Sequence, residues 1–204
     1  MKTTEPEPSS RRAVTKVATR SVIVDAAIAE FTDIGFARSS LDRVAAAADV
    51  TKGAVYHHFK DKEALFDAAF VTLEDRFTAK LTAAVDGVDD PRGKLAAGID
   101  LLLVECTDPT FRRIAVLEAP GVVGWERWRE VERRAFLGLA LAALDVLAAS
   151  GSISVPTGDL TARMLLAVTS EAGCGLSASP DARSQVERRR IGAQIMAMIG
   201  LGDT

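Results

Sequence analysis

The sequence predicts an all-α protein in which a small N-terminal helix-turn-helix unit of three helices is followed by a larger helical domain. Alanine and leucine are abundant, aromatic residues make up 5% of the 204 residues, and β-branched runs are scarce. Hydrophobic residues make up 48% of the chain, which is ample for a sizeable core. Only residues 152–156 look strand-like, and they are too few to build a sheet. We therefore expect two helical domains, at residues 14–62 and 63–204.

The chain begins with a polar, proline-containing segment, residues 1–13, that we expect to be a disordered tail. It lacks the apolar core of a signal peptide, which favours a cytoplasmic protein. An apolar stripe at helical spacing predicts the first helix over residues 14–34, and Gly35 ends it as a C′ residue. Four cations near its start form either an arm that contacts phosphates or the minor groove, or a solvated tail: Arg11, Arg12, Lys16 and Arg20.

The segment after the first helix has the features of a helix-turn-helix. Leu41 and Val44 share one face of a short helix, and the Ser40 hydroxyl can cap it. Asp49 suits the left-handed backbone that often follows a helix end, and Thr51 can cap a new helix. Two helices joined by about four residues make this motif.

The second helix of the motif, residues 52–59, has the composition of a reading element. Val55 and Phe59 face inward, which leaves a cation, small residues, a phenol and an imidazole outside. Gly53 and Ala54 give the helix start little bulk, so its backbone can lie close to phosphates or base edges in a major groove. By pattern alone, a short helix with a solvated face in an ordinary bundle remains the alternative.

A resemblance to a known family favours the first interpretation. The run ADVTKGAVYHHF from Ala48, followed by KEAL from Lys62, is similar to the signature of the TetR family of bacterial transcriptional regulators. The family usually has Gly where this chain has Asp49, and both suit a left-handed position. The resemblance implies a dimeric regulator that binds a double-stranded DNA operator in a sequence-specific way, and a repressor that a small-molecule effector releases.

The candidate DNA-binding residues divide into two groups. Ser40 and Arg43 lie on the outer side of the first motif helix, where a hydroxyl and a guanidinium can hold phosphate oxygens. The matching family positions imply phosphate contacts for Tyr56 and Lys62. They imply base-edge or near-base contacts for Thr51, Lys52, Ala54 and His57.

Charge, histidines and cysteines narrow the function classes. The chain carries a net charge of −3, with +2 on residues 1–62 and −5 on the remainder. This asymmetry is too small to indicate a nucleic-acid partner by itself. His57 and His58 diverge on a helix and no further ligand accompanies them, so we expect no metal. Neither Cys106 nor Cys174 belongs to a C-x-x-C pair, which favours buried thiols over a redox sensor or a disulfide.

A long fourth helix, residues 62–85, carries a wide apolar stripe and leaves the N-terminal unit, so it links that unit to the rest of the chain. The most apolar run, residues 135–147, is interrupted by Asp145 and too short for a membrane span, so no membrane partner is expected. Further helices are predicted, between segments rich in Gly and Pro, at residues 94–106, 110–117, 135–147, 159–176 and 182–199.

A second local resemblance lies in the run LEAPGVVGWERW from Leu117, which looks like a segment of many TetR-type regulators. Trp125 and Trp128 lie three residues apart on one helical face, a pattern more typical of core than of a ligand site. A Pro-Gly break beside paired indoles can nevertheless line a cavity. We expect no cofactor. The candidate ligand-binding residues are Phe70, Phe77, Leu102, Phe111, Ile114, Trp125 and Trp128.

The last two helices have apolar stripes wider than one neighbouring helix requires. The resemblance implies that they form a homodimer interface, a four-helix bundle about a two-fold axis; alternatively they only close the core of the monomer.

Two other functions stay open. One is a DNA-binding regulator without a ligand. The other is a helical enzyme, which is disfavoured because the sequence lacks a nucleophile motif, a phosphate-binding glycine loop and a metal set.

Overall fold

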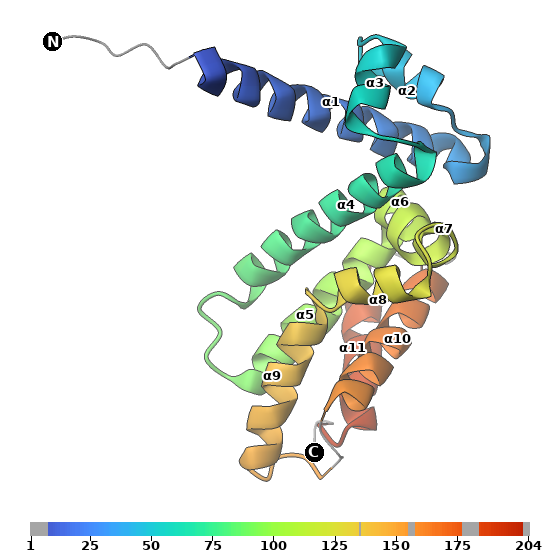
Figure 1. Cartoon of the computed structure of the whole chain (residues 1–204). Helices are drawn as coiled ribbons and strands as arrows, with labels where there is room; N and C mark the ends of the chain where they lie inside the picture. Colours follow the sequence, from blue (N-terminus) through green and yellow to red (C-terminus); the bar gives the residue numbers. More distant parts are fainter. Residues whose placement is uncertain (1–7, 135, 155–157, 177–183, 202–204) are drawn as a thin grey trace, which may run out of the picture.

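The computed structural model describes residues 8–134, 136–154, 158–176 and 184–201, and within these ranges every regular element is a helix (Figure 1). The predicted all-α class is therefore confirmed. Residues 152–154, part of the segment that looked strand-like, form no strand, and residues 155–157 lie outside the described ranges. In Figure 1, α1, α2 and α3 form an upper unit, and α4 runs diagonally from it along the lower helices.

The N-terminal unit consists of α1 (Pro8–Arg38), α2 (Leu41–Ala47) and α3 (Lys52–His58). Because α1 begins at Pro8, the prediction of a disordered tail is wrong for residues 8–13; residues 1–7 of that prediction lie outside the described ranges. Proline suits the first helical turn, where its missing N–H would be unpaired anyway. The helical path breaks at Gly35, with φ of 79°, where the sequence places the helix end.

The helix starts in the N-terminal unit are capped by the predicted side chains. The Ser40 hydroxyl accepts a hydrogen bond from the backbone N–H of Arg43 at 3.3 Å, and Thr51 does the same for Ala54 at 3.1 Å. Asp49 adopts the left-handed backbone, with φ of 52°. The turn between α2 and α3 therefore has the local geometry that its residue types predict.

An aromatic cluster fastens the N-terminal unit to the next helix, α4 (Lys62–Val85). Phe66 of α4 lies 5.1 Å from the Phe31 ring and 5.3 Å from the Phe36 ring, measured between ring centroids. Phe31 and Phe66 are fully buried. Because aromatic pairs at these distances bury large areas, they fix the first turns of α4 against α1.

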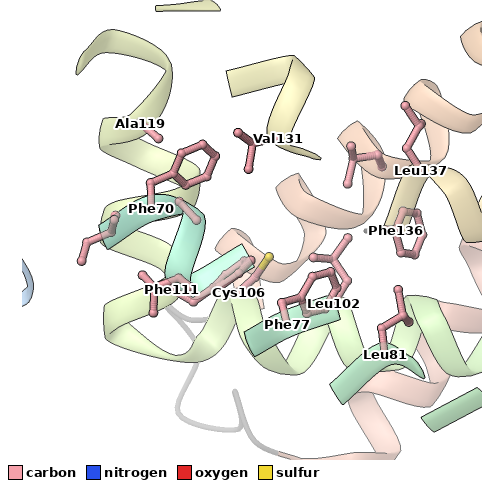
Figure 2. Close-up of a cluster of buried hydrophobic side chains, with 14 of the residues drawn as sticks. Phe70, Phe77, Leu81, Leu102, Cys106, Phe111, Ala119, Val131, Phe136 and Leu137 are labelled. Carbon is pink, nitrogen blue, oxygen red and sulfur yellow. The ribbon is translucent and has the colours of Figure 1, made fainter. Parts of the chain in front are cut away.

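The larger domain is built around α5 (Pro91–Thr107), which packs against α4 and the last three helices. Its core contains Phe77, Leu102, Cys106, Phe111 and Phe136 (Figure 2). The remaining elements are α6 (Pro109–Phe111), the π-helix η1 (Arg112–Glu118), α7 (Ala119–Val122), α8 (Trp125–Glu132), α9 (Phe136–Ala149), α10 (Asp159–Leu176) and α11 (Gln185–Met198).

The contact between α5 and α10 depends on Gly173. A Cβ at this position would lie 2.4 Å from the Cβ of Cys106 and 3.1 Å from its sulfur. We expect Gly173→Ala to lower the free energy of unfolding by about 1–3 kcal/mol, because two backbones would have to separate. Gly175→Ala on the same helix is the control, since nothing lies within 4 Å of its Cβ position. It should be neutral or stabilising by up to about 1 kcal/mol. Urea unfolding measures the free energy of unfolding of both variants. Equal values would contradict the close packing of α10 against α5 at Gly173.

Candidate nucleic-acid interface and adjoining cavity

The outward face of α3 is exposed and chemically mixed. Val55 is fully buried on the inner side of α3, which packs against α2, whereas Lys52, Gly53, Tyr56 and His57 are exposed. Thr51, which precedes the helix, is exposed as well. The start of α3 thus offers free backbone N–H groups, a hydroxyl, a cation, a phenol and an imidazole on one surface. Such groups can donate to phosphates and base edges.

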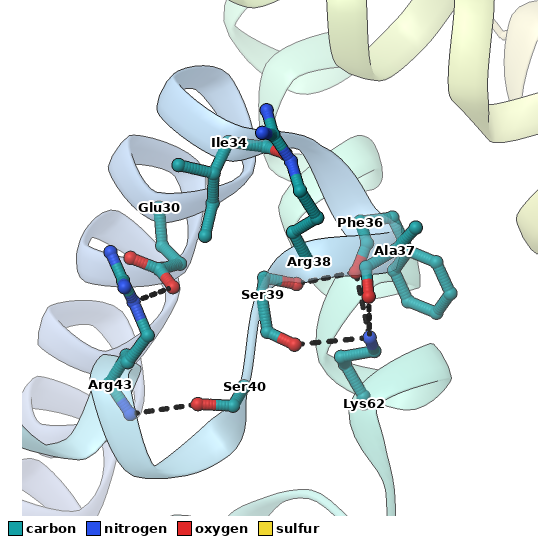
Figure 3. Close-up of polar contacts among 9 residues, drawn as sticks. All are labelled: Glu30, Ile34, Phe36, Ala37, Arg38, Ser39, Ser40, Arg43 and Lys62. Atoms are coloured by element: carbon teal, nitrogen blue, oxygen red, sulfur yellow. Dashed lines mark hydrogen bonds and ion pairs between the residues drawn. The ribbon is translucent and has the colours of Figure 1, made fainter.

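Two cations of this surface are held by acidic partners (Figure 3 shows the second pair). The ammonium of Lys52 lies 2.8 Å from a carboxylate oxygen of Asp42, and the hydrogen bond to that carboxylate raises the pKa of Lys52 above its ordinary value. The guanidinium of Arg43 lies 2.6 Å from the carboxylate of Glu30. Both partners of the Lys52–Asp42 pair are more than half exposed, so this pair is weak and Lys52 can turn toward phosphates. Arg43 is 58% exposed as well, but its partner Glu30 is only 10% exposed, so this pair holds Arg43 more firmly.

The capping role of Ser40 and Thr51 is compatible with DNA contact. Each hydroxyl oxygen accepts a backbone hydrogen bond within the chain. A hydroxyl that accepts still has its own O–H to donate. Ala54 is half-buried at the base of the same turn and adds no bulk in front of it.

Lys62 is placed differently from its predicted phosphate contact. Its ammonium donates to the backbone carbonyls of Phe36 at 2.7 Å and Ser39 at 3.1 Å, and it lies 4.2 Å from the centroid of the Phe36 ring (Figure 3). These carbonyls belong to the last turn of α1 and the residue after it, and the Phe36 carbonyl also accepts hydrogen bonds from the backbone N–H and the hydroxyl of Ser39. Lys62 therefore closes the end of α1 onto the start of α4. Its phosphate contact stays a prediction.

Further cations reach this surface from α1. Lys16 and Arg20 are exposed, and the guanidinium of Arg20 lies 5.1 Å from the centroid of the Phe59 ring. Burial, and then the charges of His57, Lys16 and Arg20, lower the pKa of His58. His58 is therefore neutral near pH 7. In the described part of the chain, no group of three His, Cys, Asp or Glu side chains could hold a metal ion.

The end of α1 is tied to η1 by three hydrogen bonds. Arg113 donates to the carbonyls of Thr32 at 2.8 Å and Asp33 at 2.9 Å. Glu118 accepts the backbone N–H of Phe36 at 2.9 Å. Position 35 favours glycine because its φ is 79°, and a Cβ there would also lie 2.7 Å from a Glu118 carboxylate oxygen. The residues at both ends of η1 thus hold the N-terminal unit.

The opposite side of η1 borders two adjoining cavities. The outer cavity, of about 410 Å³, is lined by Trp125, Trp128, Pro120 and residues of α10. The inner cavity is a narrow extension of about 20 Å³ toward α4 and α5. The two cavities adjoin, because both are lined by Val116, Glu132, Leu166 and Ser170.

The predicted ligand-binding residues separate into three sets. Trp125 and Trp128 line the outer cavity, with their ring centroids 4.7 Å apart. The inner cavity is lined by Phe77, Leu102 and Phe111. Phe70 and Ile114 are fully buried in the core and line neither cavity, so these two have no surface to offer a ligand. The indole N–H of Trp128 donates to the carbonyl of Ala115 at 3.0 Å, which fixes its ring beside η1.

Two acidic residues of the cavity were missed by sequence reasoning. Glu74 of α4 is 7% exposed, and Glu132 at the end of α8 lines both cavities. Burial raises the pKa of each to about 8, with a further contribution from a neighbouring negative charge, Asp75 for Glu74 and Glu74 for Glu132. The sequence does contain a signal that Glu74 faces inward, because it lies four residues after Phe70 and three before Phe77 on the inward stripe.

The charged side chains of α8 include one that contacts α4. Arg127 donates to both carboxylate oxygens of Asp67, at 2.9 and 3.2 Å, which raises the pKa of its guanidinium and ties α8 to α4. Glu130 and Arg134, four residues apart, form an ion pair at 3.0 Å.

The outer face of α10 and α11 is apolar. Leu160, Met164 and Met198 are 73%, 59% and 65% exposed, and with Val168 they line an open groove of about 300 Å³. No described helix is long and apolar enough to cross a membrane.

Comparisons with known proteins agree with this arrangement. A family model described as bacterial regulatory proteins of the tetR family matches residues 23–69, and one described as a tetracyclin repressor-like C-terminal domain matches residues 93–200. The uncharacterized HTH-type transcriptional regulator YhgD of Bacillus subtilis is 39% identical over 67 residues, 33% of this chain and 35% of that protein. The probable acrEF/envCD operon repressor of Escherichia coli is 34% identical over 89 residues, 41% and 40% of the two chains. The match thus spans about two fifths or less of these relatives.

Solved structures share the fold over nearly the whole chain. A TetR-family transcriptional regulator from Pectobacterium atrosepticum has a TM-score of 0.72 at 22% identity, covering 94% of this chain and 97% of that one. FadR from Bacillus subtilis, in complex with stearoyl-CoA, has a TM-score of 0.70 at 17% identity, covering 90% and 99%. RolR in complex with resorcinol has a TM-score of 0.69 at 16% identity, covering 93% and 91%.

Proposed function

Because the chain belongs to the TetR family of bacterial regulatory proteins, we propose that it is a cytoplasmic transcriptional repressor that binds its DNA operator as a homodimer and is released by a small molecule. The observation that carries this proposal is the position of η1. One side of η1 holds the end of α1 through Arg113 and Glu118, and the other borders the cavity through Ala115 and Val116.

The DNA contact is assigned to the start of α3. Its exposed residues Lys52, Tyr56 and His57, with Thr51 before the helix, can reach base edges while the backbone N–H groups face a phosphate. Arg43 and the α1 cations Lys16 and Arg20 would neutralise further phosphates. Two such units in a dimer would enter successive major grooves of a near-palindromic operator.

The dimer contact is assigned to the apolar face of α10 and α11. Exposed large apolar residues gather there, and a patch of this kind on a water-soluble protein marks an interaction site. Two copies related by a two-fold axis would bury this face as a four-helix bundle. The similarity to solved structures supports the fold of this chain, and the dimer is proposed from the apolar face itself.

Release would operate through η1. A molecule between Trp128 and the inner cavity contacts the same π-helix whose ends hold Thr32, Asp33 and Phe36 of the N-terminal unit. The ligand can shift the operator equilibrium only by the difference between its affinities for the two conformers. Irregular π-helical segments are frequent at functional sites, because they can change register within a helix.

A direct test titrates the purified chain with stearoyl-CoA, resorcinol and apolar amines while tryptophan fluorescence is recorded. Both tryptophans of the chain line the outer cavity, so binding there should change the signal. Any compound that binds should then weaken binding to a fluorescent operator by about fivefold or more, the lower end of typical coupling free energies. A compound that binds tightly and leaves operator affinity unchanged contradicts ligand-controlled release.

The coupling itself is tested at Glu118. We expect Glu118→Ala to keep ligand affinity but to reduce the ligand's effect on operator affinity by about threefold or more, because the bond to the backbone N–H of Phe36 is lost. Glu118→Gln is the matched control, since its amide oxygen can accept the same bond. Equal ligand responses of all three proteins would contradict a path through Glu118.

A further inference from the structure

A further cavity lies between α5 and α11, apart from the two cavities beside η1. Its volume is about 240 Å³, and it shares no lining residue with either of them. Small residues line it on both helices, Ala96 on α5 and Gly192 and Ala193 on α11, so few side-chain atoms fill the space between the helices. Neither the proposed DNA contact nor the proposed effector cavity uses this space.

The described lining of this cavity is basic. Three guanidinium groups line it, from Arg92 on α5 and from Arg188 and Arg189 on α11, together with one carboxylate, from Asp100 on α5. These four side chains carry a net charge of +2. A concave space lined by an excess of positive charge attracts anions, because its protein walls concentrate the field of those charges.

Two of the arginines are positioned by contacts within the chain. The side chain of Arg188 is only 15% exposed, and its Nε lies 3.3 Å from a carboxylate oxygen of Asp100. Arg92 donates to the backbone carbonyl of Leu201 at 2.9 Å, which joins the start of α5 to the residues after α11. A guanidinium carries several N–H donors in a planar fork, so it can hold a neighbour in the chain and an anion at the same time.

The third arginine belongs to a run of three, residues 188–190, whose members are used differently. Arg190 donates to a carboxylate oxygen of Glu187 at 3.0 Å and does not line the cavity. Arg189 lines the cavity, is exposed, and forms no ion pair with another described residue. Two of the three arginines in this run therefore border the cavity, and one is held on the helix surface.

The geometry points to a phosphate group as the ligand of this cavity, carried by a small phosphorylated molecule. Arginine forks match phosphate oxygens, and a tetrahedral phosphate can accept hydrogen bonds from guanidiniums of both helices at once. At pH 7.5 a phosphate monoester carries close to two negative charges, because its second pKa is about 6. This charge balances the net +2 of the lining, whereas a carboxylate brings only one negative charge.

The cavity has room for more than the phosphate. Its volume of about 240 Å³ exceeds the ~150 Å³ that holds one benzene, so a sugar-sized body fits beside the charged group. Met196 and Leu201, both buried, supply the apolar part of the wall. The site goes beyond the proposed function, since neither the operator nor the effector takes part in holding this ligand.

Calorimetric titration of the full-length protein with ribose 5-phosphate at low salt tests the ligand class. We expect a dissociation constant of about 1 mM or lower. Ribose, which lacks the phosphate, and ribonate, a sugar acid with a single carboxylate, should each bind at least about tenfold more weakly, because charge-assisted hydrogen bonds are lost. Ribose 5-phosphate that binds no more tightly than ribose or ribonate would overturn the phosphate assignment.

Two substitutions within the arginine run locate the site. Arg189→Gln should weaken binding of ribose 5-phosphate by about tenfold or more, because a guanidinium of the lining is lost. Arg190→Gln is the matched control and should stay within about twofold of the parent chain, since a charge outside the site is screened by salt. Both variants lose one positive charge, so a difference between them cannot come from net charge. Equal affinities of the two variants would contradict a site at Arg189.

Ala193→Leu tests the cavity without a change of charge. Ala193 is exposed on α11, so the fold accepts a larger side chain there, but leucine would occupy part of the cavity. We expect binding of ribose 5-phosphate to weaken by about tenfold or more, because the ligand would clash with the added atoms. Ala149→Leu, at an exposed position of α9, is the control and should bind like the parent chain. Circular dichroism checks the fold of each variant, and unchanged binding in Ala193→Leu would overturn the placement between α5 and α11.

Discussion

Replacing Met164 with aspartate is expected to convert the proposed homodimer into a monomer and to lower operator affinity by about 100-fold or more, a loss of about 2.7 kcal/mol. Met164 is 59% exposed on the apolar face of α10, so the monomer tolerates a carboxylate there. In the dimer, two carboxylates would be buried without partners near the two-fold axis. In a dimer, binding of one half-site makes binding of the second half-site effectively intramolecular. A monomer lacks this second contact and therefore binds the operator more weakly.

The control for this prediction is Val146→Asp. Val146 is 53% exposed on α9, outside the groove of α10 and α11. It should remain dimeric and bind the operator like the parent chain. Sedimentation gives the oligomeric state and fluorescence anisotropy gives the operator affinity. A Met164→Asp protein that stays dimeric would show that the interface lies elsewhere.

Replacing Ala54 with glutamate is expected to abolish operator binding while keeping or raising stability. Position 54 is the third residue of α3, and Thr51 caps this helix. A glutamate there completes a Thr-x-x-Glu capping box and lies at the positive end of the helix dipole. The same charge would face DNA phosphates in both half-sites, so we expect a loss of about 100-fold or more in affinity.

The control for Ala54→Glu is Ala79→Glu, the same substitution at an exposed position of α4. It changes the net charge of the chain equally but lies away from α3. Its operator affinity should stay within about threefold of the parent, a difference typical of distant surface charges. Thermal unfolding of both variants checks that loss of binding does not arise from loss of folding. Equal operator affinities of the two variants would remove α3 from the DNA contact.

Local chemistry made the N-terminal unit predictable from the sequence. The caps at Ser40 and Thr51, the left-handed turn at Asp49 and the break at Gly35 each depend on residues within a few positions of one another. The α10 stripe from Leu160 to Leu176 follows from helical periodicity for the same reason. The start of α1 was misplaced because polar composition suggested disorder, although proline and the residues after it suit a first helical turn.

Contacts between distant segments were not predictable in the same way. Lys62 was assigned to phosphates by its place in the motif, but its ammonium binds carbonyls more than twenty residues earlier in the chain. The links from Arg113 and Glu118 to α1 join positions about eighty residues apart. The position of Glu132 at the cavity was not predicted either, because it depends on packing against α4 and α10 rather than on its neighbours in sequence.

The most direct test of DNA recognition by a dimer is selection of binding sites from random double-stranded DNA by the full-length protein. The proposal predicts enrichment of an inverted repeat whose half-sites lie about one helical turn or somewhat more apart. It also predicts that His57→Ala changes the preferred bases within both half-sites at once, because two copies of α3 read them. Enrichment of no sequence, or of a single asymmetric site with the same preference in His57→Ala, would contradict the central claim.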